Sequence, residues 1–163
     1  MNEELLQSLG PPPFRFIPTQ AGLSGPAFTP PFKALATVIV AAGSAWLASL
    51  WHAGALGSGS STGLVWLLTA LALMLYTWWH IMRSRTRLDA GALHQSWVWD
   101  KQLELRELAY GKLIRVRGLD WLIAPRLYAR TLMGKFAVFY AADPVLLADF
   151  ERLVREVAEF RKM

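Results

Sequence analysis

The sequence predicts a membrane-spanning helical hairpin followed by a small α+β domain, in which an antiparallel sheet is closed by a C-terminal helix. Three observations lead to this prediction. Two apolar runs, residues 34–56 and 62–82, contain no Lys, Arg, Asp or Glu. Short strand-like runs separated by turn residues follow between residues 92 and 140. An amphipathic helical pattern then begins at Pro144.

The composition agrees with a chain made of two different parts. Of the 163 residues, 54% are hydrophobic and 18% are charged. With glycine counted and tyrosine left out, about 59% are apolar, against about 45–50% in soluble domains. The whole net charge of +5 lies in residues 83–163, which places a boundary near Arg83. The chain has no cysteine, which excludes a disulfide scaffold, a thiolate zinc site and a cysteine nucleophile.

Residues 1–33 form a proline-rich segment that we expect to be extended and irregular. Seven of the nine prolines lie between Pro11 and Pro31, where they block helix interiors and sheet ladders. The segment also holds Phe14, Phe16 and other large apolar residues, which are unusual in a solvated tail. Two interpretations stay open: packing along a partner or the soluble domain, and a disordered tail.

Each apolar run is long enough to cross a membrane as a helix. About 20 helical residues, rising about 1.5 Å each, span a hydrocarbon core of about 30 Å. Buried core helices are the alternative, but only about 80 residues remain to enclose them. The short polar link at residues 57–61 suits a tight turn at the far membrane surface.

Basic residues beside the apolar runs predict that both chain ends are cytoplasmic. Lys33 precedes the first run, and the 57–61 link carries no basic residue. Three arginines follow the second run at once: Arg83, Arg85 and Arg87. Because each basic residue near an anionic leaflet gains about 1 kcal/mol, these arginines are candidate contacts for lipid headgroups. The alternative is that they only set the topology.

A row of small residues lies along the first predicted helix and comprises Ala41, Ala45 and Ser49. Small residues at four-residue spacing let helices approach closely. The row serves either the packing of the hairpin itself or contact with a helix of another subunit. Neither apolar run has an ionisable residue at mid-depth, which argues against an ion or proton pathway.

The soluble part has the pattern of an antiparallel meander that begins at Ala92. In residues 112–117, strand alternation would turn Ile114 and Val116 inward and two arginines, Arg115 and Arg117, outward.

Trp97 and Trp99 would point the same way on one strand and pack as a pair. The pair belongs either to the core or to an exposed surface that binds the membrane or a partner. Together with Arg115 and Arg117, these tryptophans are a possible interaction surface.

The last element is a helix with clear start signals. Asp143 is a good N-cap residue, and Pro144 loses no needed hydrogen-bond donor at the first helical position. One apolar face recurs at three- and four-residue steps, through Leu146, Phe150, Leu153, Val157 and Phe160. We expect this helix to lie across the open sheet.

The chain resembles the bacterial PH-like domains that follow transmembrane hairpins in small membrane proteins. The resemblance covers residues 83–160 and rests on RLDAGALHQSWVWDKQLELRELAYGKLIRVRG and GKFAVFYAADPVLLADFERLVREV. It implies a strongly bent antiparallel sheet of about seven strands, a C-terminal helix capped by Asp-Pro, and a binding or scaffolding role in a bacterial inner membrane. Phosphoinositide-binding PH domains carry a basic cluster between their first two strands. By this resemblance the corresponding loop is residues 89–91, which are not basic.

No combination of residues indicates catalysis, a cofactor or a metal. His52 and His80 lie at opposite ends of the predicted hairpin, and His94 lies in the sheet, so no two share a depth for haem ligation. No nucleophile elbow, phosphate loop or metal-ligand spacing occurs. Interspersed acidic residues disfavour nucleic-acid binding.

The function that we expect is a non-enzymatic accessory or scaffold subunit of a bacterial membrane protein assembly, which presents its soluble domain to the cytoplasm. Its partners would be the anionic lipid bilayer and other membrane subunits. The alternative is a stand-alone regulatory module that senses anionic headgroups at the inner leaflet.

Overall fold

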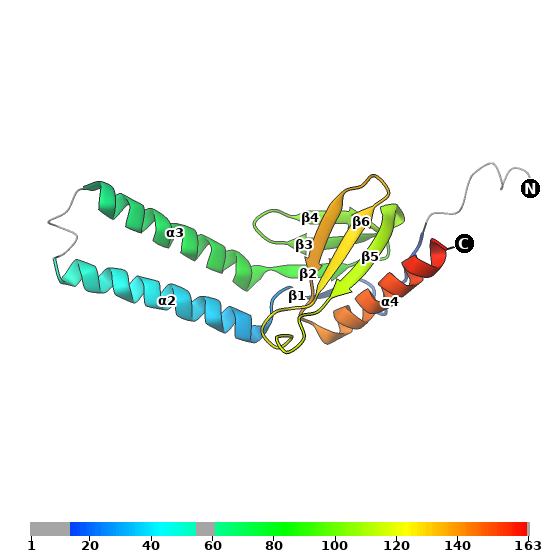
Figure 1. Cartoon of the computed structure of the whole chain (residues 1–163), viewed down its shortest axis with the longest axis horizontal. Helices are drawn as coiled ribbons and strands as arrows, with labels where there is room; N and C mark the ends of the chain where they lie inside the picture. The colour runs from blue at the N-terminus through cyan, green and yellow to red at the C-terminus, as the bar shows by residue number, and fades with distance from the viewer. Residues whose placement is uncertain (1–13, 55–60, 163) are drawn as a thin grey trace, which may run out of the picture.

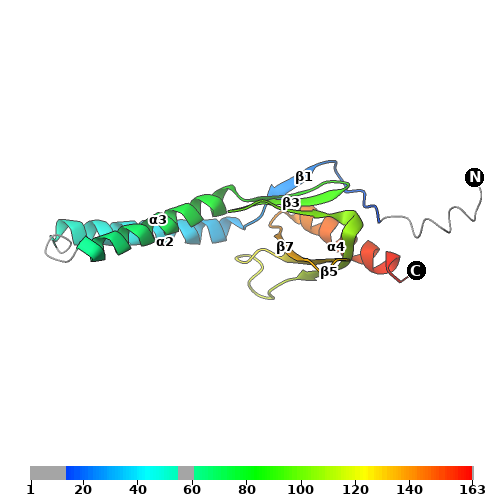
Figure 2. The same cartoon turned by 90° about the horizontal axis from the view of Figure 1, so that it is seen from above.

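The computed structural model describes residues 14–54 and 61–162. Two long helices project side by side from one end of a small domain, which consists of two sheets and a C-terminal helix (Figures 1 and 2). The elements in chain order are β1 (Leu23–Pro26), α2 (Pro30–His52), α3 (Ser61–Arg83), β2 (Arg85–Leu88), β3 (Ala92–Ser96), β4 (Lys101–Glu104), the 3-10 turn η1 (Leu105–Glu107), β5 (Leu108–Ile114), β6 (Arg126–Thr131), β7 (Phe136–Tyr140) and α4 (Pro144–Phe160).

Helices α2 and α3 are long and apolar enough to cross a membrane. Each has 23 residues and is therefore about 34 Å long. In the apolar stretch of each helix no residue is buried against the rest of the chain, which disfavours a pair of buried core helices. The expected polar link at residues 57–61 lies outside the described residues except for Ser61, with which α3 begins.

The bounds of α2 differ from the expected run of residues 34–56. The helix begins at Pro30 because Thr29 is its N-cap and accepts a hydrogen bond from the Phe32 amide through Oγ1. It ends at His52, where the Ala53 amide bonds back to the Ser49 carbonyl. Apolar composition therefore located the span, but capping set its ends.

The two helices contact each other at Gly43 and through two polar bonds. A Cβ added at Gly43 would lie 3.3 Å from Met74 Cε, so this glycine lets the helices approach. Trp78 Nε1 donates to Thr37 Oγ1 at 2.9 Å. Lys33 Nζ donates to the Met82 carbonyl at 3.1 Å, which joins the domain ends of both helices.

The seven strands form two antiparallel sheets. Strands β1-β2-β3-β4 make one sheet and β5-β6-β7 the other, each in chain order. Helix α4 packs against β5 of one sheet and β1 of the other, so it closes the space between them (Figure 2). The core lies in this space and includes Leu88, Leu93, Leu108, Leu127, Phe139, Leu146, Phe150, Leu153 and Val157.

Strand β1 comes from the N-terminal segment, so the helical hairpin is inserted between the first two strands of a sheet. Leu23 pairs with Leu88, and Pro26 pairs with Arg85. Pro26 is tolerated because β1 is an edge strand, and Pro30 lies in the first turn of α2. The segment expected to be irregular thus supplies a strand.

The residues before β1 are packed into the domain. Phe14 and Phe16 are buried in the shared core, and the Arg152 guanidinium lies 4.8 Å from the Phe16 ring centroid. Residues 14–29 therefore pack along the domain, which is one of the two interpretations of this segment. Pro11 and the rest of residues 1–13 lie outside the described residues.

The expected start of α4 is confirmed. The Asp143 carboxylate accepts from the amides of Val145 and Leu146 at 2.9 and 3.0 Å, and Pro144 is the first helical residue. Four of the five predicted apolar positions are buried, and Phe160 packs against the core while partly exposed.

Two details of the expected meander are wrong. Leu113 faces the core and Ile114 faces outward, because an irregularity between Leu108 and Tyr110 shifts the strand alternation by one residue. Trp97 and Trp99 do not share a strand, because β3 ends at Ser96 and both lie in the loop to β4.

Candidate functional site

The domain joins the helical hairpin without a flexible linker. Three residues separate β1 from α2, and Ser84 alone separates α3 from β2. The Ala27 amide donates to the Ser84 carbonyl at 3.2 Å, and Ser84 Oγ donates to the Ser96 carbonyl at 2.6 Å. We call this junction the root of the hairpin. Its bonds connect both helices directly to the four-stranded sheet.

An aromatic cluster packs at the root. The Phe28 ring lies 5.2 Å from Phe32, 6.5 Å from Trp97 and 5.6 Å from Tyr140, measured between ring centroids. The cluster joins the start of α2 to the β3–β4 loop and to β7 of the second sheet. Trp97 Nε1 is buried and has no hydrogen-bond partner within the described residues.

The three predicted headgroup arginines lie on two elements. Arg83 ends α3, with its guanidinium carbon 4.0 Å from the centroid of the Trp79 ring. Arg85 and Arg87 share the outer face of β2, about 7 Å apart along the strand. Arg87 is paired with Asp89 at 3.0 Å. Arg83 and Arg85 are thus next to the root, whereas Arg87 is farther from the helices.

Arg85 and Arg87 line a shallow groove of about 410 Å³ on the outer face of the four-stranded sheet. Arg87 is the register partner of His94, and Arg85 is the partner of Ser96. The groove also includes Lys101 and one carboxylate, from Asp100. With Asp89, which pairs with Arg87 from outside the lining, three formal positive charges stand against two negative ones. The remaining positive charge favours an anionic group in this groove.

The expected surface of Trp97, Trp99, Arg115 and Arg117 is divided between two loops. Trp97 is half-buried in the root cluster, while Trp99 is 68% exposed. Arg115 follows β5 and pairs with Glu151 of α4, and Arg117 is exposed in the β5–β6 loop. The tryptophans therefore do not pack as a pair.

The small row of α2 is exposed on the helix side away from α3. Ala41, Ala45 and Ser49 are all exposed, whereas Gly43 contacts Met74 across the hairpin. The packing of the hairpin itself therefore does not use the row.

The histidines do not come together. His80 packs on Tyr76 in α3, with ring centroids 4.5 Å apart, and His94 Nε2 lies 4.0 Å from Asp89 in the sheet. Within residues 14–54 and 61–162, no three His, Asp or Glu side chains are close enough together to hold a metal ion.

Comparison of the chain with protein-family models, curated proteins and solved structures found no match.

Sequence reasoning missed the residues that build the root. Thr29 caps α2 and also donates through Oγ1 to the Leu122 carbonyl at 2.6 Å, which ties the β5–β6 loop to the start of the helix. The only available signal was the Thr-Pro-Pro sequence, which is typical of a helix N-terminus.

Proposed function

We propose that this chain is a non-enzymatic accessory or scaffold subunit of a bacterial membrane protein assembly. Helices α2 and α3 anchor it in the inner membrane, and the domain is presented to the cytoplasm. The observation that carries the proposal is the outward row of Ala41, Ala45 and Ser49. This row offers a close-approach surface to a helix of another subunit, while Gly43 already serves the packing of the hairpin.

We further propose that the domain is PH-like. The support is its topology, with meandering sheets of four and three strands and a C-terminal helix between them. On this interpretation the loop between the first two strands is the membrane hairpin itself, because β1 precedes α2. Residues 89–91, the loop that the sequence resemblance indicates, join β2 to β3 instead. The membrane hairpin thus occupies the position at which phosphoinositide-binding PH domains carry their basic loop.

The proposed orientation places both chain ends in the cytoplasm. Lys33 and Arg83 lie at the domain ends of the helices, and the sequence between the helices contains no Lys or Arg. Basic residues next to membrane spans are concentrated on the cytoplasmic side.

Mild detergent extraction of the full chain from its own host tests the scaffold role. We expect stoichiometric recovery with other membrane subunits, and loss of this recovery in A45L, because the larger side chain prevents close helix approach. A72L is the matched control, since Ala72 is exposed on α3 outside the small row. A wild-type protein that elutes as a monomer, or equal losses in A45L and A72L, would contradict the proposal.

A second candidate function is favoured by the groove beside Arg85 and Arg87. In this alternative the chain is a stand-alone regulatory module that binds anionic lipid headgroups. Native mass spectrometry of the purified full chain, with added phosphatidylglycerol or phosphatidylcholine, tests it. We expect preferential retention of phosphatidylglycerol, which is lost in R85Q/R87Q and kept in R106Q, because Arg106 lies in η1 outside the groove. Equal retention of both lipids by the wild type would exclude this function.

A further inference from the structure

Two apolar loops flank the root of the hairpin. The β3–β4 loop contains Trp97, Val98 and Trp99, and the β5–β6 loop contains Leu119, Trp121 and neighbouring apolar residues. The exposed fractions are 68% for Trp99, 62% for Trp121 and 40% for Leu119. Each tryptophan lies beside further partly exposed apolar residues of its loop, and contiguous apolar patches of this kind mark surfaces that bind a partner or a membrane.

Both loops are held at the level where the helices enter the domain. The β3–β4 loop is tied there by the bond between Ser84 and Ser96 and by the contact of Trp97 with Phe28. The β5–β6 loop is tied there by the bond from Thr29 to Leu122. In Figure 1 both loops lie at the end of the domain from which α2 and α3 project, and Figure 2 shows the same for the β5–β6 loop.

We propose that Trp99 and Trp121 are interfacial anchors that insert into the headgroup region of the bilayer spanned by α2 and α3. This inference rests on the proposed membrane anchoring. The occupant follows from position, because the loops are bonded to Thr29 and Ser84, which directly precede α2 and follow α3, the two helices apolar enough to cross a membrane. Tryptophan is also enriched at membrane interfaces, where the ring is covered by lipid and the indole N–H remains near water.

The charge of the loops makes the contact mainly apolar. Asp100 and Asp120 lie beside the two tryptophans and oppose the nearby Lys101 and Arg117. Docking of the domain should therefore occur on zwitterionic as well as anionic bilayers. The domain would rest on the membrane at points on both sides of the hairpin and so keep a fixed orientation.

The absence of cysteine allows single-cysteine reporters to be placed next to the anchors. D100C and D120C, labelled with bimane in the full chain and reconstituted in phosphatidylcholine vesicles, keep both tryptophans in place. We expect both labels to lose most of their fluorescence when the vesicles contain shallow-brominated lipid. M133C is the distal control, because Met133 is 81% exposed and lies in the turn between β6 and β7. The fluorescence of its label should not change.

Further variants separate anchoring from simple proximity. When W99S is added to the labelled D100C protein, quenching of the label should be abolished. W121S should have the same effect on the label at D120C. The matched substitution F136S should leave the quenching of both labels unchanged, because Phe136 is 58% exposed on β7 near the distal turn. The circular dichroism spectrum of each variant should match that of the wild type, so that unfolding does not explain a loss.

The outcomes distinguish this inference from the proposed anchoring. A label at L73C, on the exposed surface of α3, should be quenched by deep-brominated lipid, and absence of that quenching contradicts the membrane anchoring itself. If L73C is quenched while D100C and D120C behave like M133C, the helices are inserted but the loops do not dock. If the loops remain quenched in W99S and W121S, the tryptophans are not the anchors.

Discussion

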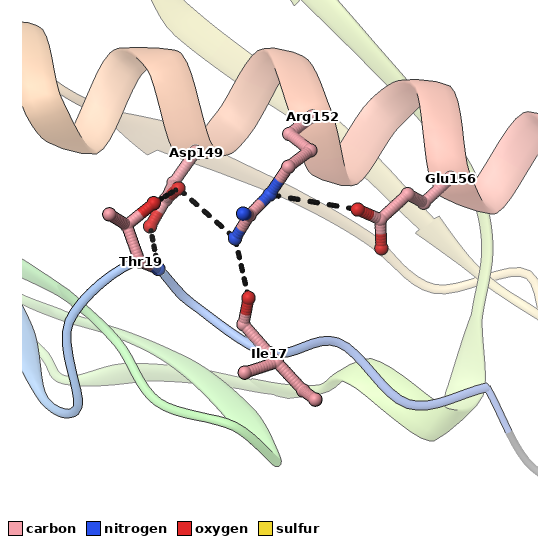
Figure 3. Close-up of polar contacts among 5 residues, drawn as sticks. All are labelled: Ile17, Thr19, Asp149, Arg152 and Glu156. Carbon is pink, nitrogen blue, oxygen red and sulfur yellow. Dashed lines mark hydrogen bonds and ion pairs between the residues drawn. The ribbon is translucent and has the colours of Figure 1, made fainter.

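Asp149 provides the sharpest test of how the N-terminal segment is held on the domain. Its side chain is 3% exposed, and it accepts from the Thr19 amide at 2.9 Å and from Thr19 Oγ1 at 2.5 Å (Figure 3). Arg152 pairs with the same carboxylate at 3.3 Å and donates to the Ile17 carbonyl. This network, which we call the clasp, joins residues 17–19 to α4.

We expect D149A to destabilise the domain strongly. Each hydrogen bond to a charged group contributes about 1.5–3 kcal/mol, and two such bonds to Thr19 are lost. Thr19 is itself exposed, so water replaces part of that loss in the variant. The free energy of unfolding should therefore fall by about 2–4 kcal/mol. D149N keeps one acceptor oxygen but turns its NH2 group toward another donor, either the Thr19 amide or the Arg152 guanidinium, and should lose about half as much.

Urea unfolding of the full chain in mild detergent, followed by tryptophan fluorescence, measures this change. E151Q is the neighbouring control, because Glu151 is 54% exposed and its pair with Arg115 should contribute at most about 1 kcal/mol. In a double-mutant cycle, T19V and D149A should be non-additive, since both remove the bond from Thr19 Oγ1, whereas the bond from the Thr19 amide is lost only in D149A.

Limited trypsin digestion provides a second measurement on the same variants. Arg15 is exposed between the buried Phe14 and Phe16, so cleavage after it reports release of the segment. D149A should be cut there faster than the wild type. A D149A protein within 0.5 kcal/mol of the wild type, with unchanged cleavage at Arg15, would refute the role of the clasp.

Three other substitutions test packing and capping in the same assay. G25A should lower the free energy of unfolding by about 1–3 kcal/mol, because its Cβ would lie 2.6 Å from Asp143 Cβ. G91A is the control and should be neutral, since there is open space around Gly91. Equal effects of the two substitutions would contradict this packing. D143A should cost about 1 kcal/mol through the loss of two cap bonds to α4, and no change would show that the cap is dispensable. T37V should weaken the hairpin by about 0.6 kcal/mol, measured by unfolding in mixed micelles, because it removes the bond from Trp78; an unchanged midpoint would argue against that bond.

The elements with strong local signals were predictable from the sequence. The uncharged runs located both long helices, and Asp143 with Pro144 located the start of α4. The apolar face of α4 was also predictable, because helical periodicity is a property of the segment alone. Helix α2 begins 4 residues before the uncharged run because Thr29 caps it, and this cap is a local feature of the sequence.

Predictions of which strand residues face the core, and of contacts between distant residues, were less successful. The irregularity between Leu108 and Tyr110 turns the Ile114 side chain outward instead of toward the core. No pattern in residues 112–117 reveals this irregularity. Trp97 and Trp99 alternate in sequence, but β3 ends before them because its partner strand β2 begins at Arg85, opposite Ser96. A one-residue shift exchanges the two faces of a strand, so a small local error changes every conclusion about exposure.

The sequence by itself determined which segments are apolar, at which residue the charged part of the chain begins, how α4 is capped and which of its faces is apolar. These properties arise from neighbours within a few residues of one another. Only the tertiary structure decided that β1 belongs to the sheet beyond the hairpin, that Thr19 bonds to Asp149, and that loops bearing Trp99 and Trp121 flank the same root. Thr19 and Asp149 are 130 positions apart, and such pairs meet only after the whole chain has folded around one core.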